Sequence, residues 1–160
     1  MSASHVTAIP TIVNHSNKSE VKLVCEYLLD EKSSSDRELY GCAVINGKVR
    51  CLDHKPIPRC VKQLRNAILS YSGLYNSCEF ARLNIGQTIY PSSSIYGTCE
   101  THIILSDCTI MFHEGESIDM KSGMGFVLSQ KARYQCKYTI KNINSNDSDV
   151  IIIMFRMLSF

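Results

Sequence analysis

Three scarcities narrow the class of protein that this sequence can encode. The chain has no tryptophan, only 20% charged residues and a net charge of +2. So small a net charge does not indicate a general binder of nucleic acid. No stretch approaches the roughly 18 consecutive apolar residues that a membrane-spanning helix needs. With 44% apolar residues among 160, the composition instead predicts a folded chain that buries one sizeable core.

Cysteine, in contrast, is abundant, with eight residues. None lies in a CxxC or CxxH cluster of the kind that holds zinc. Residues 1–18 contain no apolar signal core, so we expect an intracellular protein whose thiols stay reduced. The cysteines are then predicted to act as small buried apolar residues rather than as a disulfide framework. The nearest pairs, all nine positions apart, are Cys42/Cys51, Cys51/Cys60 and Cys99/Cys108.

The first half of the chain is predicted to consist of a flexible lead-in, residues 1–19, and an extension, residues 20–77. The mixture of β-branched, apolar and aromatic residues over 21–29 favours a strand. Asn46 and Gly47 lie between two apolar runs and predict a β-hairpin, because both central positions of a type I′ turn require positive φ.

A single helix is predicted, over about residues 58–70. Val61, Leu64 and Ile68 recur there at helical spacing. We expect the basic face of this helix to be solvated, with contact to the phosphates of DNA as an alternative that so few charges support poorly. The basic residues of that face are Arg59, Lys62 and Arg65.

From residue 78 to residue 160, the sequence predicts short strands joined by short turns. Strands at this spacing are typical of an all-β sandwich or barrel. Ile151–Phe155 is apolar at every position and is therefore placed at the centre of a sheet. The expected strands are 78–84, 87–90, 98–105, 108–113, 116–120, 125–128, 134–143 and 150–157.

The order of these strands resembles the cupin fold, a double-stranded β-helix or jelly roll. Cupins carry two motifs, G(X)5HXH(X)3–4E(X)6G and G(X)5PXG(X)2H(X)3N. With Glu100 as the glutamate of the first motif, its histidines would fall on non-histidine residues within 93–96. With Asn142 as the asparagine of the second, its histidine becomes Tyr138. Because a transition-metal site needs about three or four ligands, this alignment implies a cupin without metal, cofactor or catalytic residues.

The chain is similar to one branch of the cupins in which the histidine-rich pocket is lost, the C-terminal domain of centromere protein C (CENP-C). The similarity lies in Phe80–Gly86, Gly123–Phe126 and Tyr138–Asn142, and it does not separate CENP-C from the cupin domain of the insect CENP-A assembly factor. It covers about residues 78–157. It implies a non-catalytic dimerisation domain in the nucleus, at the centromere or kinetochore. The implied partners are a second copy of the chain and a centromere-assembly protein associated with centromeric chromatin.

Two sets of residues are therefore candidates for function. Strands that are apolar on both sides, with tyrosines near the helix, predict a homodimer interface, unless the extension covers that apolar face. The alternative function is a cupin-fold enzyme or small-molecule binder with a repurposed pocket. The interface candidates are Ile103, Leu105, Ile110, Phe112, Tyr71 and Tyr75, and the pocket candidates are Glu100, His102, Tyr138 and Asn142.

Overall fold

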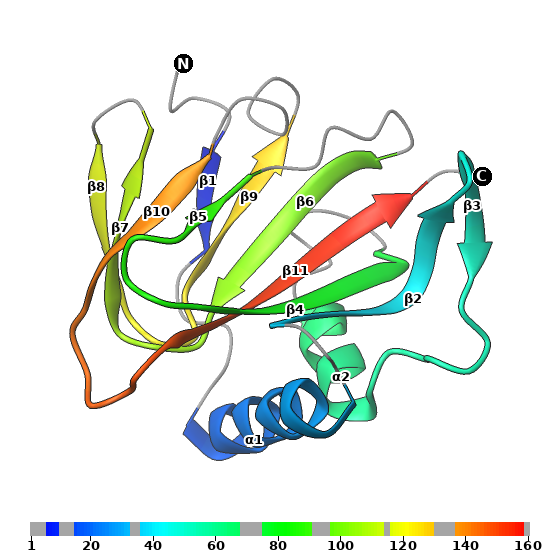
Figure 1. The fold of residues 1–160 in the computed structure, drawn as a ribbon, viewed down its shortest axis with the longest axis horizontal. Helices are drawn as coiled ribbons and strands as arrows, with labels where there is room; N and C mark the ends of the chain where they lie inside the picture. The colour runs from blue at the N-terminus through cyan, green and yellow to red at the C-terminus, as the bar shows by residue number, and fades with distance from the viewer. Residues whose placement is uncertain are drawn as a thin grey trace.

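The computed structural model of the chain is a jelly roll of two antiparallel β-sheets, with helices α1 and α2 on one side (Figure 1). This confirms the fold class that the strand pattern predicts. The structure describes residues 6–9, 15–32, 36–67, 75–90, 97–113, 116–129 and 137–158. The elements are β1 (Val6–Ile9), α1 (His15–Lys32), β2 (Arg37–Ile45), β3 (Lys48–Cys51), α2 (Arg59–Ala67), β4 (Ser77–Leu83), β5 (Thr88–Ile89), β6 (Gly97–Ile104), β7 (Cys108–Phe112), β8 (Ser117–Met120), β9 (Gly125–Ser129), β10 (Tyr138–Ile143) and β11 (Val150–Leu158).

The larger sheet has seven strands in the order β1-β9-β6-β11-β4-β2-β3, and the smaller has four in the order β5-β10-β7-β8. The strand β11 is central in the larger sheet, between β6 and β4, as its apolar sequence predicts. Its side chains alternate between the faces. Ile152 and Met154 join a cluster with residues of the smaller sheet, whereas Ile151 and Ile153 join a cluster with residues of the helices.

The main correction to the predicted elements is α1, which replaces the strand expected over 21–29. Val21, Cys25 and Leu29 are spaced by four residues and are at most 2% exposed, while Leu23 between them is 63% exposed. A burial period near four belongs to a helix, whereas a strand would bury every second residue. The expectation of a single helix is therefore wrong. The residue types of α1 favour a strand, but its buried residues have the spacing of a helix.

The predicted lead-in also contains regular structure. Residues Val6–Ile9 form β1, which pairs with β9 in the seven-stranded sheet, and α1 begins at His15. The boundary expected at residue 19 therefore falls inside a helix. The strand is easily missed because its four mostly apolar residues are a short run inside an otherwise polar, non-periodic stretch.

Two local predictions are confirmed. The hairpin of β2 and β3 turns at Asn46 and Gly47, whose φ angles of 51° and 75° fit a type I′ turn. The helix α2 covers Arg59–Ala67 of the predicted 58–70; the remainder of that range lies outside the described residues.

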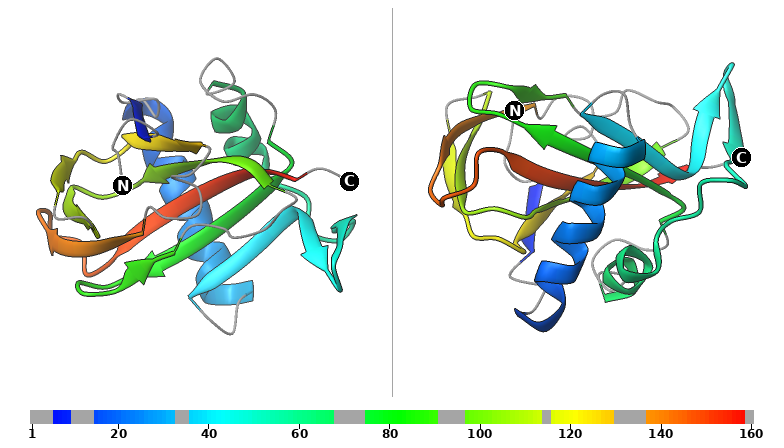
Figure 2. Two further views of the ribbon diagram at one scale, coloured as in Figure 1. Left: turned by 90° about the horizontal axis from the view of Figure 1, so that it is seen from above. Right: turned by 60° about the horizontal axis from the view of Figure 1, so that its bottom comes forward.

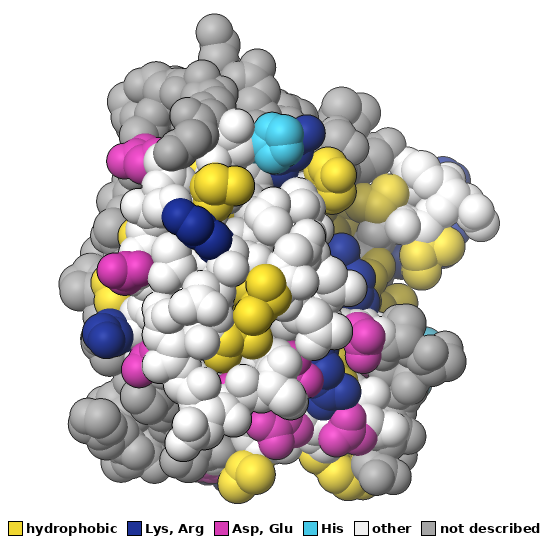
Figure 3. Space-filling model, turned by 60° about the vertical axis from the view of Figure 1, so that its left-hand side comes forward, with side chains coloured by type: hydrophobic (Ala, Val, Ile, Leu, Met, Phe, Trp, Pro, Cys, Tyr) yellow, Lys and Arg dark blue, Asp and Glu magenta, His cyan; other side chains and the backbone are white. Residues whose placement is uncertain are grey.

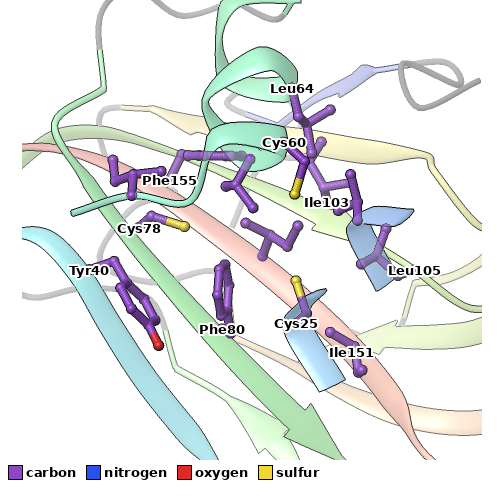
Figure 4. Close-up of a cluster of buried hydrophobic side chains, with 14 of the residues drawn as sticks. Cys25, Tyr40, Cys60, Leu64, Cys78, Phe80, Ile103, Leu105, Ile151 and Phe155 are labelled. Carbon is purple, nitrogen blue, oxygen red and sulfur yellow. The ribbon is translucent and has the colours of Figure 1, made fainter. Parts of the chain in front are cut away.

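The helices cover the outer face of the seven-stranded sheet, the face turned away from the smaller sheet (Figure 2). Ile103 and Leu105 lie in the cluster beneath them (Figure 4). Tyr75 belongs to the same cluster, and all three residues are at most 1% exposed. Ile110 and Phe112 are buried in the other cluster, between the sheets. These interface candidates are therefore internal, and the extension covers the apolar face; Tyr71 lies outside the described residues.

The homodimer itself stays a prediction, but without the surface that we expected for it. The outer side of the smaller sheet is mainly polar, with charges of both signs and apolar side chains in separate small groups (Figure 3). Met111 on β7 is one exposed apolar residue there, at 38%.

Candidate functional site

A row of polar side chains crosses the inner face of the seven-stranded sheet. It lies beside the apolar cluster between the sheets, which includes Ile104 of β6 and Met154 of β11. On β6, Glu100 and His102 point to the same side because they are two residues apart. Arg156 of β11 is directly opposite Glu100 in the register. Neighbouring strands thus bring a carboxylate, an imidazole and a guanidinium together inside the fold.

His102 joins this row to the smaller sheet. Its Nδ1 lies 2.7 Å from the Tyr138 hydroxyl, and its Nε2 lies 3.2 Å from Oε1 of Glu100. A carboxylate accepts hydrogen bonds, so Nε2 donates to Glu100; in the tautomer with its single proton on Nε2, Nδ1 accepts from the Tyr138 hydroxyl. All three residues are at most 1% exposed. We call this arrangement of Tyr138, His102 and Glu100 the buried relay.

Arg156 extends the relay toward the surface. Its Nε donates to Oε1 of Glu100 at 2.9 Å, and its Nη1 donates to Oε1 of Glu79 at 2.8 Å. Glu79 also accepts from Arg37, at 2.7 Å from Nε and 3.0 Å from Nη2. The Arg37 side chain is 46% exposed, so the contacts run from the interior of the jelly roll to solvent.

The charges of this network support one another. Burial by itself would raise the pKa of Glu79, but the guanidinium groups of Arg37 and Arg156 outweigh it and lower that pKa below its ordinary value. Burial likewise opposes the charge of Arg156, yet Glu100 and Glu79 raise the pKa of Arg156. Glu79 and Arg156 are therefore ionised at neutral pH.

Aromatic rings fill the space around the relay. His102 stacks on Phe126 with ring centroids 5.3 Å apart, and Phe126 meets the edge of Tyr138 at 5.1 Å. Phe112 packs against both Phe126 and Tyr138, at 5.5 and 5.6 Å. The low-dielectric surroundings strengthen the hydrogen bonds of the relay and make any unpaired polar atom there costly.

A groove of about 540 Å3 lies along the open side of the jelly roll, between β2, β4 and β5. Arg37 belongs both to this groove and to the polar network. Arg82 contacts Asp30 at 2.7 Å and Asp149 at 3.3 Å. The groove is lined by Asp36, Arg37, Arg82, Leu83, Gln87, Thr88 and Tyr90.

Three of the four predicted pocket residues come together in the relay, and the fourth does not. Asn142 is exposed, and its Nδ2 donates to Oδ1 of Asn144 at 2.7 Å. On α2, Arg59 and Lys62 are exposed, as the solvated-face prediction has it; the side chain of Arg65 lies outside what the structure describes.

Sequence reasoning missed Arg156, Glu79 and Arg37. One signal could have found Arg156: it is a charged residue inside the otherwise apolar run of the central strand, 150–158. A charge in a strand buried on both faces requires a partner. Ile152 and Arg156 lie on the same face of the strand as Met154, two positions to either side of it. Ile152 extends the apolar core, whereas buried Arg156 requires a carboxylate nearby.

No protein-family model matches the sequence, and a search of the curated proteins finds no similar sequence. Solved structures do match, and they define the class of fold. The structure of OsALKBH1 is similar with a TM-score of 0.68 and 10% identity, over 96% of each chain. At such low identity the likeness shows the fold alone.

Two hydroxylases have the same fold. A Pseudomonas putida prolyl-4-hydroxylase matches with a TM-score of 0.58 and 11% identity, over 99% of this chain and 95% of that one. The viral collagen prolyl hydroxylase vCPH from Paramecium Bursaria Chlorella virus-1, solved as its 2OG complex, also has a TM-score of 0.58 and 11% identity. It matches over 98% of this chain and 97% of its own.

These matches correct the family expected from the short motifs. The structural likeness is to 2-oxoglutarate-dependent oxygenases, which share the cupin-like jelly roll, and not to CENP-C. The expected centromere and kinetochore location and the non-catalytic role depended on CENP-C, and they are overturned with it. The centromere-assembly partner stays a prediction that nothing here tests. The motifs misled because they record strand rhythm, which all cupin-like folds share.

Oxygenases of this class imply a bound iron, and the residues that the structure describes do not fit one. Among the described residues, no three His, Cys, Asp or Glu side chains are grouped so that they could hold a metal ion. Both nitrogens of His102 are engaged, and Arg156 places a cation on the same Glu100 oxygen that faces the imidazole. A metal ion there would have to displace a guanidinium.

In the described ranges, no helix is long and apolar enough to cross a membrane.

Proposed function

We propose that this chain is an enzyme that binds a small 2-oxo acid and acts on it by proton transfer, without iron. The observation that carries the proposal is the buried relay of Tyr138, His102 and Glu100. Burying such groups costs free energy unless each of them is partnered. Buried ionisable residues that hydrogen-bond one another, in a fold that hosts enzymes, mark a candidate active site.

The ligand class is supported by the groove and by one of the similar structures. The hydroxylase vCPH is solved with 2OG. In this chain, Arg37 and Arg82 line the groove, and the planar guanidinium of arginine binds carboxylates through two parallel hydrogen bonds. Both arginines already contact protein carboxylates, Arg37 with Glu79 and Arg82 with Asp30. A ligand must share or exchange these partners, so we expect weak binding.

The relay supplies acid–base chemistry. The contact of Glu100 with Nε2 orients the imidazole of His102, and the hydroxyl of Tyr138 ends the relay. The next residue, Thr139, hydrogen-bonds Thr88 of the groove at 2.8 Å. The backbone of β10 at Tyr138 thus adjoins the wall of the groove, while the Tyr138 side chain points to the opposite face of the strand, into the inner cluster. A ligand must therefore reach the hydroxyl from inside the jelly roll. A 2-oxo acid carries an acidic C–H beside its ketone, and proton exchange at that carbon is the reaction such a relay would support.

A binding measurement tests the ligand class. Calorimetric titration of 2-oxoglutarate into the purified chain in excess EDTA should show saturable binding. Arg37→Gln should weaken it, because one guanidinium of the groove is lost. Arg50→Gln is the matched control, since Arg50 is an exposed arginine on β3 outside the groove. No binding at millimolar 2-oxoglutarate, or binding that requires added Fe(II), would contradict the proposal.

A second measurement tests the reaction. In deuterated buffer with EDTA, NMR should show deuterium entering the carbon beside the ketone of 2-oxoglutarate faster than in a blank. Tyr138→Phe removes only the hydroxyl at the end of the relay and should abolish the acceleration. Tyr40→Phe, a tyrosine in the outer cluster, should leave it unchanged. Equal exchange in both variants would remove the relay from the reaction.

A further inference from the structure

Two cysteines face each other across the hairpin of β2 and β3. Cys42 and Cys51 are direct partners in the strand register, and their Sγ atoms lie 3.2 Å apart. Both are free thiols; Cys42 is 6% exposed and Cys51 is exposed. The prediction that the cysteines are small buried apolar residues therefore holds for Cys42 but not for Cys51.

The position of the pair in the hairpin suits a cross-link. The amide of Leu52 donates to the carbonyl of Gly41 at 2.7 Å, and the amide of Cys42 donates away from the hairpin to Asn76. Residues 41 and 52 are thus a hydrogen-bonded pair, and Cys42 and Cys51 are the adjacent pair without mutual hydrogen bonds. Such pairs have Cα atoms about 4.5 Å apart, which lies within the range that a disulfide spans.

We propose that Cys42 and Cys51 are a reversible oxidation site that forms an intramolecular disulfide across the hairpin. The oxidant is a small-molecule disulfide such as glutathione disulfide. The exposed thiol of Cys51, as thiolate, attacks one sulfur and releases one glutathione. Cys42 then loses its proton to solvent, attacks the Cys51 sulfur and releases the second glutathione. Two protein thiols are oxidised, and one glutathione disulfide is reduced to two thiols.

The order of these two steps follows from exposure. Burial, with a smaller contribution from the contact with Cys51, raises the pKa of Cys42 to about 11. Cys42 is therefore a poor first nucleophile, but it lies beside the sulfur that a mixed disulfide on Cys51 would carry. Four other cysteines whose side chains the structure describes, Cys25, Cys60, Cys78 and Cys108, are buried.

Peptide mapping tests the proposal on the full chain. After incubation with glutathione disulfide, the free thiols are alkylated and the chain is digested with trypsin without reductant. Cleavage at Arg37, Lys48, Arg50 and Arg59 puts Cys42 on peptide 38–48 and Cys51 on peptide 51–59. We expect these two peptides to appear joined, and to separate when the oxidised protein is treated with dithiothreitol before digestion.

Single variants give the step order and the control. Cys42→Ser should stop at glutathione bound to Cys51, whereas Cys51→Ser should leave Cys42 unmodified. Circular dichroism confirms that both variants are folded. Two results would overturn the proposal: persistent glutathione on Cys51 of the unaltered chain without joined peptides, or Cys51 joined to a cysteine other than Cys42.

Discussion

The two faces of the seven-stranded sheet are made by the same strands but completed in different ways. On β11, Ile151, Ile153 and Phe155 face the helices, and all are apolar. Ile152, Met154 and Arg156 face the smaller sheet, and the last of these is charged. The outer face is thus closed mainly by apolar packing under α1 and α2, while the inner face changes from apolar to ionic along its length.

The apolar outer face mainly stabilises the fold, whereas the ionic part of the inner face holds the side chains that could carry out a reaction. Apolar burial is non-directional and scales with area, so the outer face needs only residues of suitable size. The inner network needs each donor matched to an acceptor, because a single missing partner leaves a charge buried. A protein selected for stability alone gains little from such a network, and its presence in the jelly roll therefore supports a site.

The largest effect should come from the outer face. Phe80 is fully buried there and packs on Tyr40, with ring centroids 5.2 Å apart. Phe80→Ala should lower the free energy of unfolding by about 3–5 kcal/mol, from lost burial and the cavity left behind. Urea denaturation measures the loss. Tyr27→Ala on α1, where the side chain is 57% exposed, is the control and should change stability by less than about 0.5 kcal/mol.

The inner face should respond to charge rather than to volume. Arg156→Met keeps much of the side-chain length but leaves Glu100 and Glu79 each with fewer donors. We expect a loss of about 2–3 kcal/mol, the usual cost of removing a partner from a buried charged group. Adding Glu100→Gln should recover part of it, because an amide needs no counterion. If the double variant is less stable than Arg156→Met alone, the two faces do not differ in the way described.

Much of this fold could be predicted, because strands and tight turns leave local signals. The Asn46-Gly47 turn and the helix from Arg59 depend on nearby residues only. The failure at α1 has a clear cause. Its residue types favour a strand, whereas the four-residue spacing of the buried Val21, Cys25 and Leu29 is that of a helix. The same spacing is visible in the sequence, so this helix was predictable from periodicity but not from residue type.

The site was only half predictable, since it is assembled by pairing between distant strands. Glu100 and Tyr138 were predicted from the alignment with the cupin motifs, and His102 from its place two residues after Glu100 on the same expected strand. Arg156 and Glu79 come from β11 and β4, and no local pattern shows that they meet Glu100. Register between strands is decided by the whole sheet. A pattern along the sequence can therefore point to a buried charge but not to its partner.

The ionic part of the inner face should also make stability depend on pH. The pKa of Glu79 is lowered in the folded protein, because Arg37 and Arg156 outweigh the effect of burial. Its ionised form therefore stabilises the fold above the unfolded pKa of about 4.3. That contribution should be lost as the pH falls through the lower, folded pKa.

Urea midpoints measured between pH 6 and pH 3 test this dependence. Glu79→Gln should lose less stability on acidification than the unaltered chain does. Glu116→Gln, which changes an exposed glutamate next to β8, is the control and should reproduce the unaltered profile. Identical profiles for all three proteins would mean that ionised Glu79 contributes nothing to the pH dependence of stability.

The smallest effect should come from a position that belongs to neither face. Gly47 has a φ of +75°, and a Cβ placed on it would meet no atom within 4 Å. Gly47→Ala should therefore cost only the strain of a left-handed backbone, about 1 kcal/mol in urea denaturation. Gly41 has a similar φ of +83°, but its Cβ would lie 2.5 Å from the Asn76 carbonyl oxygen. Gly41→Ala should cost distinctly more, because steric contact adds to the same strain; equal losses would mean that backbone conformation alone decides the outcome at both glycines.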